Sequence, residues 1–159
     1  MDGSIRPAAQ KDRAAIKGIL IRTRAFRPAE IKCALEVFDA GTQTRDSGYN
    51  VFVFIGDNAP LGYVCYGPTP LTEGTFDIYW IAVDPRFQHQ GIGWRLLMWA
   101  EEAIAAAGGR LIILQTSSQS AYEAPRRLYR RSGYILEGTI ANYYSPGDDM
   151  LIYTKSLQP

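Results

Sequence analysis

The segment from Ile78 to Ala107 limits what this chain can fold into more than any other part, because three local signals follow one another without a break. Its first residues, 78–83, are rich in β-branched and aromatic side chains and end at Asp84-Pro85, which predicts a strand that stops at a turn. Small and apolar residues then recur at helical spacing up to Gly108-Gly109, namely Leu96, Leu97, Ala100, Ala103, Ile104 and Ala107. The sequence therefore predicts a strand, a glycine-bearing loop and a helix in direct succession.

The loop in this segment carries Gly91 and Gly93 just before the predicted helix. Glycine has no Cβ atom, so the backbone can adopt positive φ angles there and come close to a ligand. The first N–H groups of a helix have no partner inside it, and the helix dipole places positive charge at the same end. We therefore predict an anion site suited to phosphate, which we call the cradle and define as residues 88–95. The alternative is that the two glycines serve a tight strand-to-helix turn and nothing more.

The composition is that of a globular protein without a marked charge. The chain has 159 residues, and 17 basic against 16 acidic side chains give a formal charge of +1, which favours no nucleic-acid partner. Cys33 and Cys65 make neither a disulfide framework nor a metal cluster, and we predict that both are buried in a reducing compartment. Neither a secretory segment nor a bilayer-spanning stretch is visible, so we expect a single domain, residues 1–159, in the cytoplasm and without a membrane partner.

The rest of the chain predicts a mixed α/β fold around that segment. Residues 10–26 read as an amphipathic helix, and Pro28 suits the first turn of a second helix that breaks near Gly41. The apolar residues 111–114 follow the cradle helix, which predicts a strand parallel to the one before it. A further helix is expected to start near Pro125. The other predicted strands are 4–6, 49–55, 61–66, 75–83, 134–140 and 150–157, with a type II turn at 145–148.

Two motifs at a fixed separation resemble those of one enzyme superfamily. Residues 81–85, Ile-Ala-Val-Asp-Pro, followed by residues 88–93, Gln-His-Gln-Gly-Ile-Gly, resemble motif A of the GNAT superfamily of N-acetyltransferases. Residues 128–134, Leu-Tyr-Arg-Arg-Ser-Gly-Tyr, resemble its motif B, and the order of elements fits over nearly the whole chain. The resemblance implies the GNAT fold, an α/β fold whose mixed, mostly antiparallel sheet has splayed central strands and flanking helices.

The resemblance also implies acetyl-CoA as cosubstrate, with no metal. The backbone of the cradle would hold the pyrophosphate, and Val83 would pair with the pantetheine arm beside a bulge near Ile81 and Ala82. His89 is the only histidine of the chain, and we interpret its side chain as a solvated spectator above the phosphates. The cofactor-binding residues implied in this way are Ile81, Ala82, Val83, Gln88, His89, Gln90, Gly91, Ile92, Gly93, Trp94, Arg95 and Tyr122.

Catalysis in this superfamily is direct attack of an amine on the thioester, and the resemblance assigns one phenol to it. Tyr129 matches the motif B tyrosine that protonates the leaving thiolate, although it could instead be an aromatic anchor of its helix. Many family members carry a glutamate base in the strand before the cradle, but that position here is Tyr79, and a phenol is a poor base at neutral pH. Asp77 lies on the same strand face and could act through a water, or it could be a solvated carboxylate; Glu73 is a weaker candidate.

These residues predict an N-acetyltransferase that acts on a primary amine of a small molecule or peptide. The alternative is an acyl-CoA-binding sensor or partner module without efficient catalysis, which the tyrosine at position 79 would suit. By fold analogy the loops 26–45 and 68–74 form much of the acceptor pocket, and a homodimer is possible because dimers are common in the family. Further acceptor-side candidates are Gln115, Thr116, Ser117, Ser118, Asn142, Tyr143 and Tyr144.

Overall fold

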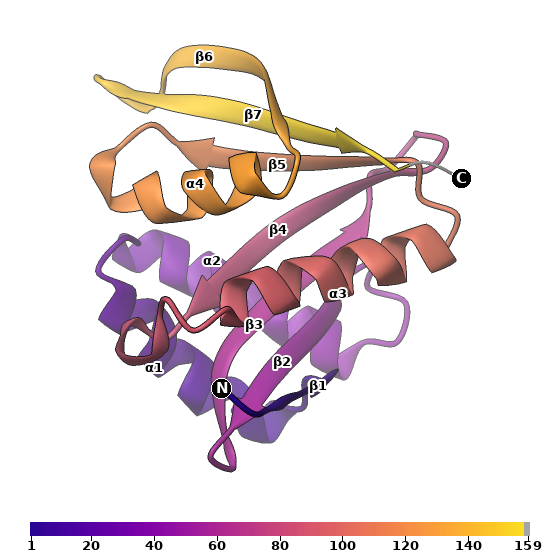
Figure 1. The fold of residues 1–159 in the computed structure, drawn as a ribbon, viewed down its shortest axis with the longest axis vertical. Helices are drawn as coiled ribbons and strands as arrows, with labels where there is room; N and C mark the ends of the chain where they lie inside the picture. The colour runs from indigo at the N-terminus through magenta and orange to yellow at the C-terminus, as the bar shows by residue number, and fades with distance from the viewer. Residues whose placement is uncertain (158–159) are drawn as a thin grey trace. The chain divides into compact units, whose positions relative to one another are not determined.

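The structure is a computed structural model that describes residues 1–157 and consists of two compact units. The first unit comprises residues 1–67 and 78–102, and the second comprises residues 68–77 and the chain from 103 onward (Figure 1). Within the described residues, seven strands are hydrogen-bonded in the order β1-β2-β3-β4-β5-β7-β6. The strands are β1 (Ser4–Pro7), β2 (Asn50–Gly56), β3 (Ala59–Pro68), β4 (Thr75–Val83), β5 (Leu111–Ser117), β6 (Ile135–Ser145) and β7 (Asp148–Ser156). The helices are α1 (Arg13–Thr23), α2 (Pro28–Gln43), α3 (Ile92–Ala106) and α4 (Glu123–Arg131), with short 3-10 turns η1 (Gln10–Asp12), η2 (Pro85–Phe87) and η3 (Ser120–Tyr122).

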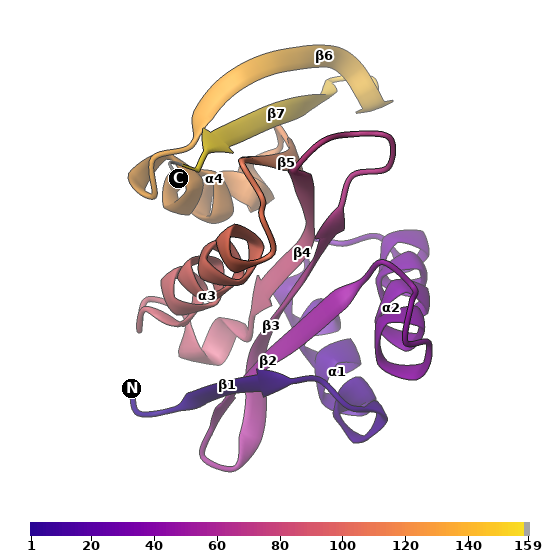
Figure 2. The same ribbon diagram turned by 90° about the vertical axis from the view of Figure 1, so that its right-hand side faces the viewer.

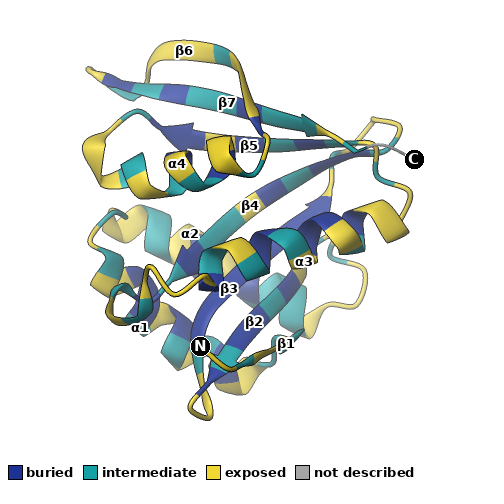
Figure 3. Cartoon of the chain, in the orientation of Figure 1, coloured by how far each residue is buried: buried dark blue, intermediate teal, exposed yellow. Residues whose placement is uncertain are grey.

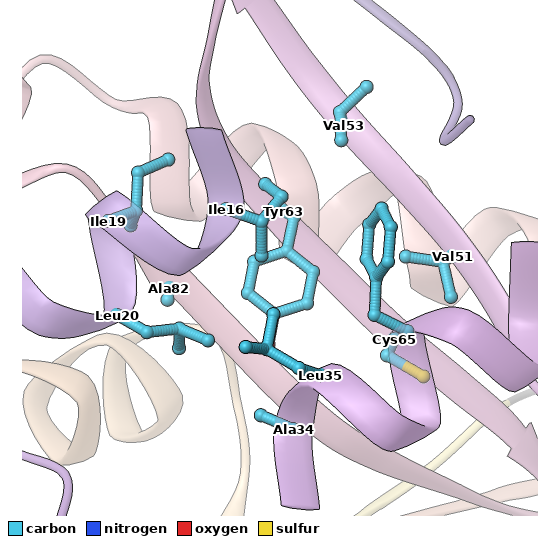
Figure 4. Close-up of a cluster of buried hydrophobic side chains, with 11 residues drawn as sticks. Ile16, Ile19, Leu20, Ala34, Leu35, Val51, Val53, Tyr63, Cys65 and Ala82 are labelled. Atoms are coloured by element: carbon cyan, nitrogen blue, oxygen red, sulfur yellow. The ribbon is translucent and has the colours of Figure 1, made fainter. Parts of the chain in front are cut away.

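In the first unit, helices cover both faces of the antiparallel strands β1, β2 and β3 (Figure 2). Helices α1 and α2 lie on one face, where buried side chains form the core drawn in Figure 4. The cradle helix α3 lies on the other face. The members of the core are Ile16, Ile19, Leu20, Ala34, Leu35, Phe38, Val51, Val53, Tyr63, Cys65 and Ala82.

Close packing holds the end of β4 and the start of α3 against β3. A Cβ atom at Gly62 would lie 2.9 Å from the carbonyl oxygen of Ala82 and 3.1 Å from Leu96. Only glycine fits such an approach, because Cβ contacts below 3.0 Å force the neighbour to move. Asp84, the residue after β4, also donates its backbone N–H to the carbonyl of Leu61 at 2.8 Å. The strand and helix that flank the cradle are therefore fixed to one rigid partner strand.

The second unit is built on β5, β7 and β6. Strand β7 pairs antiparallel with both β5 and β6, and β4 pairs parallel with β5 from Thr75 to Asp77. The parallel pairing covers three residue pairs among the described residues. Helix α4 packs on β7 through Tyr129, whose ring centroid lies 6.0 Å from that of Tyr153. The outer strand β6 is exposed along most of its length (Figure 3).

The structure confirms the order and type of the predicted elements, including the parallel step from β4 through α3 to β5. Several predicted boundaries are wrong, and the largest error is in β6, which runs to Ser145 and not to residue 140. Helix α1 ends at Thr23 and not at Phe26, because Arg24 adopts a left-handed conformation with φ of 54°. Helix α2 does not break at Gly41 but continues to Gln43, and β5 extends three residues further, to Ser117.

The two cysteines differ in their surroundings. Both are free thiols; Cys65 is buried in β3, but Cys33 is exposed on α2, so the prediction that both are buried is wrong for Cys33. The inward face of α2 carries Ala34, Leu35 and Phe38, and Cys33 falls on the opposite side. Among residues 1–157, no helix is long and apolar enough to cross a membrane, and no group of His, Cys, Asp and Glu side chains could hold a metal ion.

Candidate cofactor and catalytic site

The cradle is an exposed loop that opens directly into helix α3. Gly91 adopts a φ of 80°, and a Cβ atom placed on it would meet no other atom within 4 Å. The first hydrogen bond of the helix runs from the N–H of Arg95 to the carbonyl of Gly91, at 3.0 Å. The N–H groups of residues 92–94 therefore have no acceptor inside the helix. Free amides, the positive end of the helix dipole and open space above Gly91 together fit a phosphate-bearing group.

A second residue of the cradle has left-handed backbone geometry. His89 adopts a φ of 61°, which is uncommon for a residue with a side chain. His89 and its neighbours Gln88 and Gln90 are all exposed. Left-handed residues in a turn direct backbone N–H groups into one concavity, which is how backbone nests bind anions. The unusual backbone at His89 thus supports the cradle through the main chain. Its side chain stays a predicted spectator.

The side chains of the first helical turn do not all face the ligand position. Ile92 is buried against Gly62 of β3, and the guanidinium of Arg95 donates to the carbonyl oxygen of Gly3 at 2.8 Å. The guanidinium of Arg95 also lies 4.7 Å from the ring centroid of Phe54, a cation–π contact. Trp94, by contrast, is 55% exposed. The predicted role of Ile92 in cofactor binding is thereby narrowed to its backbone N–H group. The backbone N–H of Arg95 donates to Gly91 and its guanidinium donates to Gly3, so Arg95 anchors the first turn of α3.

Asp84 holds the turn between β4 and the cradle. Its carboxylate is fully buried and accepts bonds from the backbone N–H of Arg86 at 3.1 Å and from the guanidinium of Arg86 at 2.8 Å. Arg22 of helix α1 donates to the same carboxylate at 2.6 Å. Hydrogen bonds from Arg86, and then from Arg22, hold the pKa of Asp84 well below its usual value. The carboxylate is therefore charged at neutral pH.

Two aromatic residues of β4 stand just before Ile81 and Ala82, the pair for which a bulge was predicted. The ring of Tyr79 lies 5.3 Å from that of Tyr49, and the ring of Trp80 lies 5.6 Å from that of Phe26. Tyr49, Phe26 and Trp80 all pack against the core beneath α1 and α2. Tyr79 and Trp80 are thus both held by aromatic contacts, and the bulge at Ile81 and Ala82 stays a prediction. Tyr79 remains 37% exposed beside this cluster.

In the second unit, Tyr129 is a buried tyrosine of α4 that is 5% exposed. Its ring contacts those of Tyr134 and Tyr153 at centroid distances of 6.1 and 6.0 Å. Burial raises the pKa of Tyr129 above its ordinary value, and the neighbouring Tyr122 and Tyr153 add to the shift. The phenol therefore stays protonated at neutral pH. It can donate a proton or a hydrogen bond, and it cannot act as a base there.

Asp77 is half-buried near the start of β4 and accepts a short hydrogen bond, 2.5 Å, from the hydroxyl of Thr69. Thr69 belongs to the predicted acceptor loop 68–74 and also bonds to the carbonyl of Thr75 through its backbone N–H, at 2.8 Å. The carboxylate thus has a fixed orientation. The weaker base candidate, Glu73, is exposed, as is Gln115 on β5.

Sequence reasoning missed three residues that organise these sites. Arg22 holds the turn before the cradle, and Thr69 orients Asp77. Arg126 is buried and donates to the carbonyls of Ser117 and Gln119, which fixes the start of the helix that carries Tyr129. Two of these contacts join residues eight or nine apart, and the third joins residues 62 apart. A search for hydroxyl or arginine donors near the predicted base could have suggested Thr69, but no local pattern indicates Arg22.

Comparison with known sequences identifies the family. The acetyltransferase (GNAT) domain matches residues 47–136, more than half of the chain. The N-alpha-acetyltransferase RimI of Mycobacterium tuberculosis is 31% identical over 137 residues, which are 80% of this chain and 82% of that protein. The S-(2-succino)cysteine N-acetyltransferase of Bacillus subtilis is 32% identical over 73 residues. That match spans 46% of this chain and 44% of that enzyme, so it covers less than half of each.

Solved structures agree with the sequence comparison. A crystal structure of a GNAT-family acetyltransferase from Desulfovibrio desulfuricans is 36% identical and superposes with a TM-score of 0.92 over 98% of this chain and 99% of that one. The fold is also that of yncA from Salmonella typhimurium, solved with acetyl-CoA, at a TM-score of 0.79 and 21% identity over 100% of this chain and 96% of that one. No finding favours a non-catalytic binding module. The chain belongs to the GNAT superfamily and is an acetyl-CoA-dependent N-acetyltransferase.

Proposed function

We propose that the cradle, residues 88–95, holds the pyrophosphate of acetyl-CoA while a primary amine attacks the thioester. The observation that carries this proposal is the left-handed Gly91, with open space above it, at the start of α3. Val83, the last residue of β4, pairs through its backbone with the pantetheine arm, as an added strand would. Tyr122 and the exposed side chains of Gln88 and Gln90 complete the proposed cofactor contacts.

Acetyl-CoA supplies an acetyl thioester, whose C–S bond breaks as the amine nitrogen bonds to the carbonyl carbon. Tyr129 donates its proton, or a hydrogen bond, to the sulfur that leaves. An alkyl amine has a pKa of about 10, so the site must also remove a proton from the attacking nitrogen. Asp77 takes that proton through a water, oriented by Thr69. Tyr79, which occupies the usual place of the base, instead contributes an aromatic wall with Tyr49.

The acceptor is a primary amine of a small molecule or of a peptide. The aromatic side chains beside β4 favour an acceptor that carries apolar surface next to its amine, because Phe26, Tyr49 and Trp80 bear no charge. Relatives named above are an N-alpha-acetyltransferase and an S-(2-succino)cysteine N-acetyltransferase, whose names point to amine acceptors. Tyr143 and Tyr144 stay predicted acceptor contacts from β6, together with Asn142.

A screen for thiol release from acetyl-CoA tests the function directly. Purified protein is incubated with panels of alkylamines, amino-acid derivatives, peptides with free N-termini and aminoglycosides. We expect release of CoA with amines or peptides that carry apolar groups and little with polycationic aminoglycosides. If no panel causes release of CoA while acetyl-CoA still raises the melting temperature, the result would favour an acyl-CoA-binding sensor without efficient catalysis.

Replacing Asp77 by asparagine tests the base. The change keeps the size of the side chain and a hydrogen-bond acceptor for Thr69, but it removes the charge that accepts a proton. We expect kcat to fall by about a hundredfold, the lower end of the effect of a general base. Glu73→Gln, in the loop before β4, is the matched control and should leave kcat nearly unchanged. A large loss in the control with little loss in Asp77→Asn would move the base to Glu73.

Three further properties stay predictions. We expect the two units to work as one domain over residues 1–159, and we expect a cytoplasmic enzyme, in which free thiols such as Cys33 and Cys65 persist. The possible homodimer is tested by the mass of the protein in solution.

A further inference from the structure

Arg22 forms an ion pair that joins helix α1 to the turn before the cradle. It lies in the last turn of α1, and its guanidinium donates to the carboxylate of Asp84 at 2.6 Å, across 62 positions of the chain. The side chain of Asp84 is 1% exposed, whereas that of Arg22 is 39% exposed. A buried carboxylate is stable only when its oxygens accept hydrogen bonds, so loss of the Arg22 partner destabilises the turn that Asp84 holds.

That turn leads straight into the cradle. The backbone carbonyl of Asp84 accepts from the N–H of Phe87 at 2.8 Å, and its side chain accepts from the N–H of Arg86 at 3.1 Å. These bonds shape η2, and Gln88, the first residue of the cradle, follows it. Arg86 is a local partner from the turn itself. Arg22 is the partner that ties the turn to a separate helix.

Gly18 makes room for this ion pair. It lies one helical turn before Arg22, and a Cβ atom placed on it would be 2.8 Å from Nη1 of Arg22. The guanidinium therefore lies over the glycine on its way to Asp84. Glycine inside a helix is less favourable than alanine, so α1 gives up some helical stability at the one position that the arginine crosses.

We propose that Arg22 is a positioning residue for acetyl-CoA, which it serves by holding Asp84 and thereby the start of the cradle, in the space that Gly18 leaves open. The proposal rests on the cradle being the pyrophosphate site. Arg22 touches no reacting atom in this proposal. Its effect is on cofactor binding and not on the chemical step.

Two variants perturb the ion pair to different degrees. Arg22→Gln removes the charge, and Gly18→Ala places a methyl group 2.8 Å from Nη1 of Arg22, so the flexible guanidinium must shift while the helix becomes more favourable. We expect Arg22→Gln to raise KM for acetyl-CoA about tenfold, Gly18→Ala to raise it by a smaller factor, and both to leave kcat at saturating acetyl-CoA within about twofold. In Gly18→Ala the melting temperature should stay equal or rise, so a loss of cofactor affinity there cannot come from a weaker fold.

Arg13→Gln is the matched control. Arg13 also lies on α1, its side chain is 40% exposed, and it forms an ion pair with Asp39 at 2.8 Å, away from the cradle. KM for acetyl-CoA should be unchanged in this variant. Normal KM values in both Arg22→Gln and Gly18→Ala would overturn the proposal. Measuring Gly91→Asp in the same series separates the proposal for Arg22 from the proposal for the cradle. An unchanged KM for acetyl-CoA in Gly91→Asp would contradict the cradle itself. A raised KM in Gly91→Asp together with a normal KM in Arg22→Gln would contradict only the role of Arg22.

Discussion

Gly91→Asp should abolish the rise in melting temperature that acetyl-CoA gives the wild-type protein. The new carboxylate would stand above the first turn of α3, where no other atom lies within 4 Å of the Cβ position. Because that space is open, the side chain fits without a clash, and its negative charge meets the phosphates. We expect the Kd for acetyl-CoA to rise at least tenfold, about 1.4 kcal/mol, as measured by calorimetry and thermal shift.

Two controls separate charge from backbone strain in this experiment. Gly91→Asn has nearly the same size and tolerates positive φ as well as aspartate does, but it is neutral, so it should lose much less affinity. Gly147→Asp places the same charge at a glycine of equal φ, 80°, and equally open surroundings in the turn between β6 and β7, and it should bind normally. Added salt should restore part of the affinity of Gly91→Asp because it screens exposed charges. Equal losses in the aspartate and asparagine variants would show that the backbone matters and the charge does not.

Local signals were sufficient to predict the strand, the glycine loop and the helix that follow one another in residues 75–106. The strand 75–83 has the predicted boundaries, and the glycine loop leads into the helix as expected. Each of these features depends on neighbouring residues: β-branched side chains for the strand, Gly91 for the left-handed turn, and apolar spacing for α3. The same holds for the C-terminal turn, where Gly147 adopts the positive φ that a type II turn requires.

Features that depend on tertiary packing could not be predicted in this way. Gly41 reads as a helix breaker, yet α2 continues through it. A Cβ atom at this position would lie 2.6 Å from Val51, so the glycine serves to let the helix pack closely on β2. The pairing of Arg22 with Asp84 joins two residues 62 positions apart, and nothing in either local sequence indicates it. The orientation of Asp77 likewise depends on Thr69, across a loop whose path the sequence does not determine.

Tyr129→Phe should lower kcat by about a hundredfold, about 2.7 kcal/mol, and leave the affinity for acetyl-CoA nearly intact. The substitution removes one hydroxyl from a buried ring and keeps the contacts of that ring with Tyr134 and Tyr153, so α4 should remain packed. Steady-state kinetics with the acceptor found in the screen provide the measurement. Tyr134→Phe is the matched control, because it takes a hydroxyl from another buried tyrosine of the same cluster and should leave kcat unchanged.

The pH dependence of the wild-type enzyme gives a second test of the same phenol. Burial raises the pKa of Tyr129, and an acid with a raised pKa keeps its proton to higher pH than an exposed tyrosine, whose pKa is about 10. Ionisation of Tyr129 should therefore cause no loss of kcat up to about pH 10. A Tyr129→Phe enzyme as fast as the wild type would show that the tyrosine only packs α4 against β7. A loss shared equally by Tyr134→Phe would assign the effect to the packing of the cluster, because only a proton donor depends on one particular hydroxyl.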